Sequence, residues 1–226
     1  MEKEGFILID KPEGITSHDV VDKLREFTKI KKIGHAGTLD PFATGILILG
    51  VGRSATKRLS RFLKMDKEYI AKLRLGAVSE TFDRDGKIEF KEVKKVPSKE
   101  EVIKAAKEFV GEIYQTPPPY SAKRIKGVRA YELARKREKP KLKPQRVRIY
   151  RMEVLNYKFP YLKIRVNCSS GTYIRCLAFD IGKKLGCGAL LEELRRTKIG
   201  KFSVEETKRL NEINSGNWEK FLVYNP

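Results

Sequence analysis

Residues 34–51 read GHAGTLDPFATGILILGV, a polar stretch rich in glycine that runs directly into an apolar one. The first part, 34–45, predicts a loop, because its glycines permit turns and close backbone approach. The second part, 46–51, is a short continuous apolar run, which is typical of a buried strand. Asp40 is the acid of the loop, and Pro41 restrains it to extended conformations. We therefore expect a stiff loop that leads into the core of the protein.

The segments on either side alternate between strand and helix patterns without a regular strand–helix–strand rhythm. Strands are expected at 6–10, 69–75, 145–156 and 161–168. Helices are expected from Ser17 and from Ser54, each capped by that serine, from Ser98 with Glu101 in a capping box, and from about Thr172. Residues 190–202 fit a helix or a strand equally well. This order predicts an α+β fold, a single domain over 1–226 with a mixed, mainly antiparallel central sheet flanked by helices and loops.

The net charge of +20 indicates a polyanionic partner, with nucleic acid ahead of an anionic membrane surface. The excess is concentrated in residues 121–151, which hold thirteen Lys or Arg against two acids, interleaved with tyrosines. Basic groups mixed with aromatics suit RNA, where phosphates take the charge and exposed bases stack. The alternative is a solvated, salt-bridged face, but the acids needed for such bridges are scarce in this stretch.

Several classes of protein are disfavoured by composition. No apolar run approaches the roughly 20 residues that span a bilayer, and the N-terminus does not resemble a signal peptide, so we expect a cytoplasmic protein. The three cysteines, 168, 176 and 187, match no zinc spacing, and the chain has two histidines. We therefore expect no metal site, and core packing as the role of Cys176.

Asp40 has two interpretations on the residues alone, and they are evenly balanced. A lone carboxylate on a stiffened loop, with His35 nearby in sequence, could act as a nucleophile or a general base. The same aspartate could instead cap its own turn, which is a common role for Asp before Pro. The loop sequence does not decide between these roles.

Four further motifs accompany GHAGTLDPFATG in a fixed order: FILIDKPEGITSHDVV at 6–21, KEYIAKLRLG at 67–76, PPPYSAKRIKG at 117–127 and SSGTYIRCLAFDIG at 169–182. The ordered set resembles the TruB-type tRNA pseudouridine synthases from about Gly5 to Phe202. The resemblance implies isomerisation of uridine to pseudouridine in the T-loop of tRNA, at position 55 in standard tRNA numbering. It also implies that the reaction needs no metal or organic cofactor.

The resemblance assigns three catalytic roles. Asp40 matches the catalytic aspartate, which acts on the target nucleotide as the glycosidic bond breaks. Tyr69 matches the tyrosine that stacks on the base and is proposed to remove the C5 proton. Arg175 matches the arginine that pairs with the aspartate. Without the resemblance, Tyr69 reads as an ordinary strand tyrosine and Arg175 as a surface cation.

The remaining site residues are expected to bind the substrate. Leu194 matches an apolar residue beside the base, His35 a histidine that helps to flip out or hold the nucleotide, and Lys11 with Pro12 a motif that buttresses the loop. Further contacts with RNA are expected at Tyr173, Lys57, Lys123, Arg124 and Arg146.

The basic stretch 121–151 corresponds in the family to an inserted loop that grips the T-arm of tRNA. Many members also carry a C-terminal PUA domain, and residues 203–226 are too few for one, so the resemblance predicts a short form without it. We expect tRNA as the partner, a monomer, and no required protein partner or membrane. Two alternatives stay open: a guide-RNA-dependent pseudouridine synthase, and a non-catalytic protein that binds RNA or helps tRNA to fold.

Overall fold

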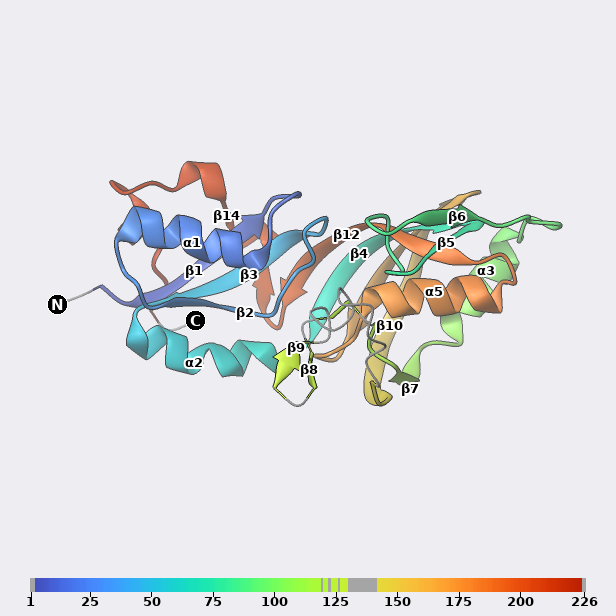
Figure 1. The fold of residues 1–226 in the computed structure, drawn as a ribbon, viewed down its shortest axis with the longest axis horizontal. Coiled ribbons are helices and arrows are strands. Elements are labelled where there is room, and N and C mark those ends of the chain that lie inside the picture. Colours follow the sequence, from blue (N-terminus) through green and yellow to red (C-terminus); the bar gives the residue numbers. More distant parts are fainter. Residues whose placement is uncertain (1–2, 119, 122, 126, 130–141, 225–226) are drawn as a thin grey trace. The chain divides into compact units, whose positions relative to one another are not determined.

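The computed structural model describes residues 3–118, 120–121, 123–125, 127–129 and 142–224, which fold as a mixture of helices and strands (Figure 1). Contacts along the chain divide it into two compact units. Unit 1 comprises Met1–Tyr69 with Leu194–Pro226, and unit 2 comprises Ile70–Glu193. The division falls within two strands, β4 (Lys67–Leu75) and β12 (Ala189–Ile199).

Unit 1 is built on a mixed sheet whose central strand is β3 (Thr44–Val51). β1 (Gly5–Lys11) pairs antiparallel with β3 along its whole length, and β14 (Lys208–Arg209) runs parallel to β1. The other edge of β3 is shared. β12 pairs parallel with its first residues, and β2 (Ile33–Ala36) pairs antiparallel with its last ones. β13 (Phe202–Ser203) continues the sheet beside β12.

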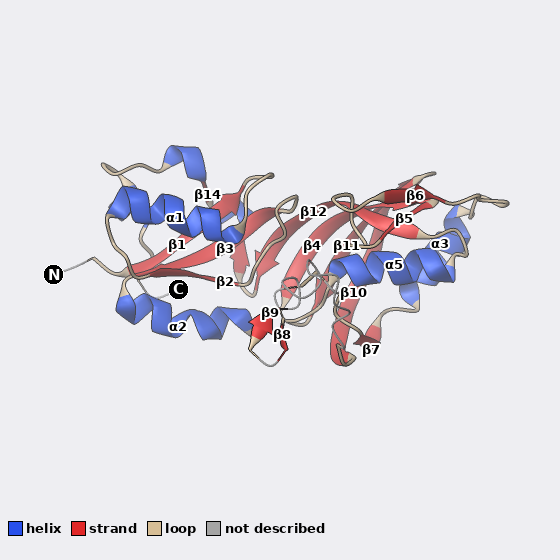
Figure 2. Ribbon diagram, viewed as in Figure 1, coloured by secondary structure: helices blue, strands red, loops and turns tan. Residues whose placement is uncertain are grey.

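Two helices cover the two faces of this sheet, α1 (Ser17–Thr28) and α2 (Arg53–Leu63) (Figure 2). Since neighbouring strand residues point to opposite faces, β1 contributes to both layers of core. Ile7 and Ile9 join α1 in one cluster, whereas Phe6 and Leu8 join α2 in the other. Unit 1 is therefore a three-layer structure in which β1 and β3 are buried on both sides.

The chain after β13 follows unit 1 in short 3₁₀ turns, η1 (Val204–Glu206), η2 (Leu210–Glu212) and η3 (Trp218–Phe221). Trp218 is buried in the same cluster as α1. This packing anchors the C-terminal segment to unit 1.

Both serine caps predicted in unit 1 are wrong. The cap of α1 is Thr16, whose hydroxyl accepts from the Asp19 backbone while Asp19 returns a bond to the Thr16 backbone. The N-terminus of α2 begins after Gly52, and the carboxylate of Glu4 accepts from the backbone N–H groups of Arg53 and Ser54. A carboxylate distant in sequence thus satisfies the free donors that a local serine was expected to satisfy.

In unit 2, neighbouring strands follow the order β4, β11 (Tyr161–Cys168), β10 (Gln145–Lys158) and β7 (Gly111–Gln115). Two helices belong to this unit, α3 (Lys99–Lys107) and α5 (Ile174–Lys184). Two small hairpins complete the described part, β5 (Ala77–Ser79) with β6 (Ile88–Phe90), and β8 (Arg124–Ile125) with β9 (Val128–Arg129).

Most of the expected elements are confirmed, including the mixed, mainly antiparallel sheet. The strand patterns at 6–10, 46–51, 69–75, 145–156 and 161–168 lie within β1, β3, β4, β10 and β11. The ambiguous segment 190–202 is mostly the strand β12. Residues 34–36 were expected in a loop but form part of β2, and Thr44 and Gly45 already belong to β3. No described helix is long and apolar enough to cross a membrane.

We expect Gly182→Ala to destabilise unit 2. A Cβ at Gly182 of α5 would lie 2.1 Å from the Ala189 backbone nitrogen and 2.4 Å from the Gly188 carbonyl carbon, so the helix would have to move away from β12. Overpacking of this kind costs about 1–3 kcal/mol. Urea unfolding should show this loss. Lys183→Ala, at an exposed position of the same helix, is the matched control and should leave the midpoint almost unchanged.

Candidate active site

The Asp40 loop joins β2 to β3 and is held by backbone contacts. Leu39, Phe42 and Ala43 are buried beneath it, while Asp40 itself is half-exposed. The Ala43 N–H donates to the Asp40 carbonyl at 3.0 Å and closes a turn around the proline. Asp40 therefore sits at the surface of a loop whose neighbours are fixed in the core.

Ser17 fastens this loop to α1. Its hydroxyl accepts from the Leu39 N–H at 2.9 Å and donates to the Leu39 carbonyl at 3.3 Å. The Gly14 N–H also donates to the Pro41 carbonyl at 2.9 Å. The serine that was expected to cap the helix thus holds the residue next to Asp40.

Lys11 lies beneath the same loop and is fully buried. Its ammonium donates to the carbonyls of Pro12, Ile15 and Pro41, at 2.8, 2.7 and 3.1 Å. Burial lowers the pKa of Lys11 to about 8, and the negative charge of Asp40 opposes that shift. These bonds tie the loop at Pro41 to the segment that follows β1, and the buttressing role of Lys11 stays a prediction.

Arg196, which belongs to β12, holds the chain at the start of the loop and just after its end. Its guanidinium is buried and donates to the carbonyls of Ile46 and Gly37, at 2.8 and 3.0 Å. Gly45 allows the backbone of β12 to come close to that of β3, because a Cβ there would lie 2.2 Å from the Arg196 carbonyl oxygen. Its φ of 109° also favours glycine.

Arg195 points to a different partner. It forms a bidentate ion pair with Asp10, at 3.0 and 2.7 Å, and donates to the Thr44 hydroxyl at 3.3 Å. These residues line an open pocket of about 570 Å³ together with Lys23, Phe27 and Arg209. The paired arginines at 195–196 therefore fix both the start of β3 and the loop that precedes it.

Tyr69 and Leu194 are both buried strand residues. Tyr69 belongs to β4 and Leu194 to β12, and β12 lies between β3 and β4 in the strand order. The Thr197 hydroxyl of β12 donates to the Glu68 carboxylate, next to Tyr69, at 2.7 Å. One strand thus separates Tyr69 from β3, into which the Asp40 loop leads. His35 lies in β2, which pairs directly with β3, and its cross-strand partner there is Leu49.

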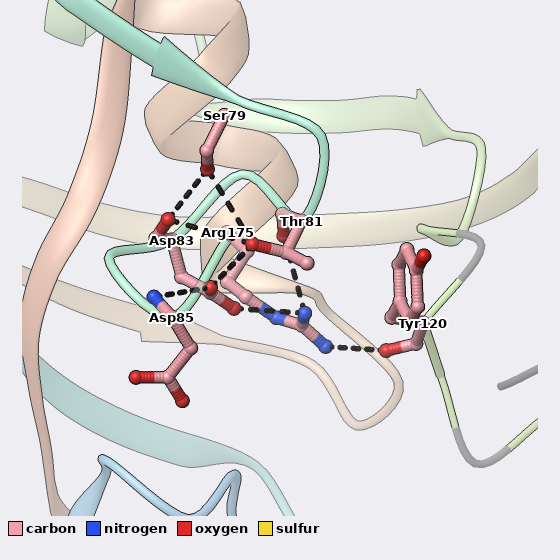
Figure 3. A network of polar contacts seen from close by, with 6 residues as sticks. All are labelled: Ser79, Thr81, Asp83, Asp85, Tyr120 and Arg175. Carbon is pink, nitrogen blue, oxygen red and sulfur yellow. Dashed lines mark hydrogen bonds and ion pairs between the residues drawn. The ribbon is translucent and has the colours of Figure 1, made fainter. Parts of the chain in front are cut away.

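Arg175 is buried in the first turn of α5, so its interpretation as a surface cation is wrong. It forms an ion pair with the Asp83 carboxylate at 3.0 Å and donates to the carbonyls of Thr81 and Tyr120, at 3.2 and 2.8 Å (Figure 3). Asp40 and Arg175 belong to different units, and their pairing stays a prediction.

Asp83 was not among the predicted site residues. Its carboxylate also accepts from the Thr81 hydroxyl at 2.6 Å and from the Asp85 N–H at 3.1 Å, so both oxygens are engaged (Figure 3). Backbone bonds between Arg84 and Leu191 and between Leu191 and Phe82 hold the turn. A buried carboxylate and a buried guanidinium neutralise each other here, and Asp83 fixes the direction of Arg175. The mostly polar run SETFDRDG at 79–86 was the available signal.

The expected RNA contacts are scattered. Lys57 is exposed on α2, and Arg146 is exposed on β10 with Glu112 at 3.5 Å. Tyr173 is the N-cap of α5, and its backbone exchanges two hydrogen bonds with the Gln115 amide. Lys123 is half-exposed, whereas the Arg124 side chain and residues 122, 126 and 130–141 of the basic stretch lie outside the described residues.

The cysteines have packing roles. Cys168, Cys176 and Cys187 are buried and reduced, and burial raises the pKa of Cys176 to about 12. A thiol with that pKa stays protonated at neutral pH, which disfavours it as a nucleophile. Over the described ranges, no group of three or more His, Cys, Asp or Glu side chains is arranged to hold a metal ion.

Comparison with known proteins gives the same family for the N-terminal and the C-terminal part of the chain. The model described as TruB family pseudouridylate synthase (N terminal domain) matches residues 25–174, and that of the tRNA pseudouridylate synthase B C-terminal domain matches 175–221. The tRNA pseudouridine synthase B of Clostridium tetani is 47% identical, over 97% of this chain and 75% of that protein. Its counterpart from Protochlamydia amoebophila is 45% identical, over 98% of this chain and 84% of that protein.

A solved structure is similar as well. A chain of an H/ACA RNP bound to a substrate RNA superposes with a TM-score of 0.68 at 32% identity, over 92% of this chain. The present chain spans about half of that solved chain, 51%. With a family model over most of its length and curated relatives at 45–47% identity, this chain belongs to the TruB family of pseudouridine synthases.

Proposed function

We propose that this protein isomerises the T-loop uridine of tRNA, position 55 in standard tRNA numbering, to pseudouridine, with Asp40 as the catalytic carboxylate. The observation that carries the proposal is the Asp40 loop itself. Ser17, Lys11 and Arg196 fix its backbone at three residues and hold the start of β3 as well, yet the Asp40 carboxylate is left half-exposed. Rigid support around a reachable acid is the arrangement that catalysis by a positioned group requires.

The reaction fits the groups that the family assigns to it. The uracil leaves C1′ of the ribose with help from the Asp40 carboxylate, rotates, and rejoins through C5. The C5 proton is then lost, with Tyr69 as the residue proposed to take it, and N1, now free of the ribose, takes up a proton. The product is an isomer of the substrate, so the overall reaction consumes no co-reactant.

The buried Lys11 ammonium supports an ionised Asp40. Lys11 is held within the electrostatic reach of Asp40, and positive charge near a carboxylate favours its charged form. In unit 2, Asp83 holds the Arg175 guanidinium in one orientation. This geometry is consistent with an arginine set in advance to meet an acid, as the family resemblance implies.

The substrate is expected to be free tRNA, since the curated relatives at 45–47% identity are named tRNA pseudouridine synthase B. A uridine inside the folded T-loop must leave its stack to reach a carboxylate, and a neighbouring aromatic can replace the lost stacking. The net charge of +20 suits the phosphates of that partner.

The alternative function is guide-RNA-dependent isomerisation. It is favoured by the likeness to a chain of an H/ACA RNP, although at a lower identity of 32%. Activity on an isolated T-arm hairpin, without any guide RNA or further protein, separates the two functions. We expect that activity.

Asp40→Asn should strongly reduce isomerisation. The amide removes the charge and the basicity of the carboxylate while it keeps the shape of the side chain, so we expect a loss of about 10²- to 10⁴-fold in kcat/KM. Release of tritium from a T-arm labelled at uridine C5 measures the reaction. Retained tRNA binding by the variant is the control for folding. Tritium release at the wild-type rate would contradict the role of Asp40.

Asp83→Asn should lower kcat by about 100-fold with little change in KM, because the Arg175 guanidinium loses its ionic partner and its orientation. Asp85→Asn is the matched control. Its exposed carboxylate points away from Arg175 (Figure 3), so it should retain nearly full activity. Equal losses in the two variants would show that the ion pair does not position Arg175.

The pH dependence of activity and of stability should both reflect the titration of Lys11. Its pKa is lowered to about 8, so the ammonium loses its proton as pH rises through 8 and activity should fall there. Stability should change in the opposite direction. Between pH 8 and the ordinary pKa of 10.5 the unfolded chain binds more protons at this lysine, so this group's contribution to stability rises with pH. Lys11→Met should be less active at pH 7 and should lack the decline near pH 8.

A further inference from the structure

The sheet of unit 2 has one face that the helix α5 does not cover. The Gln115 side chain of β7 bonds to the backbone of Tyr173, at the start of α5, and so marks the inner face. Tyr114 precedes Gln115 and therefore points to the opposite side. Its cross-strand partner Arg146 points to that side as well. We call this side the outer face.

Three adjacent strands each place one tyrosine on the exposed side of the sheet. Tyr114 of β7 is 75% exposed, Tyr150 of β10 is 46% exposed, and Tyr161 of β11 is 39% exposed. Leu162, Ile164 and Val166 of β11 are buried, so the alternation of that strand places Tyr161 on the outer face. Tyrosine rings this exposed contribute little to the core.

A cation accompanies each of these rings. Arg146 lies opposite Tyr114 in the register of β10 and β7. The Arg148 guanidinium is 5.7 Å from the centre of the Tyr150 ring, and the Lys72 ammonium of β4 is 4.6 Å from the centre of the Tyr161 ring. Two of the rings thus contact a cation directly, and the third has a cation as its cross-strand neighbour.

The outer face is also positively charged. Register and exposure place seven cations on it against three glutamates, Glu112, Glu153 and Glu193. The cations are Lys72, Arg146, Arg148, Arg151, Lys158, Lys163 and Arg165. Within the described part of the chain, Arg148, Lys158 and Lys163 form no ion pair. The charge is therefore not neutralised by the face itself.

We propose that the outer face of unit 2 binds an unpaired segment of RNA. Bases would stack on Tyr114, Tyr150 and Tyr161, and the cations beside the rings would contact the phosphates that link those bases. An exposed sheet with one aromatic on each of several strands is a known platform for single-stranded RNA. Stacking on aromatic rings tolerates any base, so the site selects single strands without selecting a sequence.

Other polyanions fit this face less well. A duplex hides the faces of its bases, so it could use the cations but not the three tyrosines. An acidic protein segment would likewise leave the rings without the stacking partners that bases provide. The combination of rings and cations favours unpaired RNA over both.

This surface is separate from Arg175, the residue of unit 2 to which the proposed isomerisation assigns a catalytic role. Arg175 belongs to α5, on the inner side of the sheet, and Tyr114, Tyr150 and Tyr161 face away from that helix. The bound segment would therefore be RNA outside the T-loop, and loss of this contact should leave the chemical step intact.

The test compares two RNAs on one triple variant, Tyr114→Thr/Tyr150→Thr/Tyr161→Thr. Threonine keeps the preference for strand and removes the ring. The first RNA is a fluorescein-labelled single strand of about twelve nucleotides. The second is an isolated T-arm hairpin labelled with tritium at uridine C5. We expect the affinity for the single strand to fall at least about tenfold, because stacking accounts for much of such binding, while kcat/KM on the hairpin stays within about twofold.

Tyr224→Thr is the matched control, since it removes an exposed tyrosine of unit 1. It should change neither measurement. Unchanged single-strand affinity in the triple variant would overturn the proposal, and so would an equal loss in Tyr224→Thr. Loss of hairpin activity together with single-strand binding would overturn the separation of the two surfaces.

A second measurement uses the wild-type protein and needs no folded variant. Photo-cross-linking with a single strand that carries 4-thiouridine should label peptides that contain Tyr114, Tyr150 or Tyr161. Labels confined to other peptides would overturn the proposal. Both experiments stay informative if Asp40 proves dispensable, because neither the single-strand affinity nor the cross-link depends on isomerisation.

Discussion

The Asp40 loop depends on one buried cation. The Lys11 ammonium reaches no solvent, so its hydrogen bonds must be made to the three carbonyls that accept them. Those carbonyls come from the chain just after β1 and from the loop beside Asp40. A neutral donor could make similar bonds but would give the acid no positive neighbour. Burial of this charge is unfavourable for stability, as the lowered pKa of Lys11 indicates, and is compatible with a role that needs the charge.

A second constraint is the close approach of β12 to β3. Two consecutive arginines of β12 bind different partners, since alternate strand residues point to opposite faces. Arg195 pairs with Asp10 on one side, and Arg196 enters the core on the other to hold Gly37 and Ile46. Gly45 is required where the two backbones meet. The geometry of the loop is therefore set largely by backbone carbonyls, and the side chains supply the cations that hold them.

The sequence predicts well those features whose cause is local. The alternation of β4 and the capping box of Ser98 with Glu101 depend on residues within a few positions of each other, and both are confirmed. The failures have distant causes. Thr16 and Ser17 both offer a hydroxyl, and Ser17 is instead engaged by Leu39, which lies 22 residues away. Asp83 went unrecognised because its partner Arg175 lies 92 residues further along the chain.

The two faces of the sheet in unit 2 obey different requirements. The inner face must pack against α5 and fix the start of that helix through Gln115, so its residues are determined by folding. The outer face does not pack against α5, so that packing does not determine its residues. Strand propensity alone favours tyrosine at an exposed position, and would account for each ring taken singly. It does not account for a cation beside every ring, because like charges repel across neighbouring strands. A polyanion whose bases stack accounts for both features together.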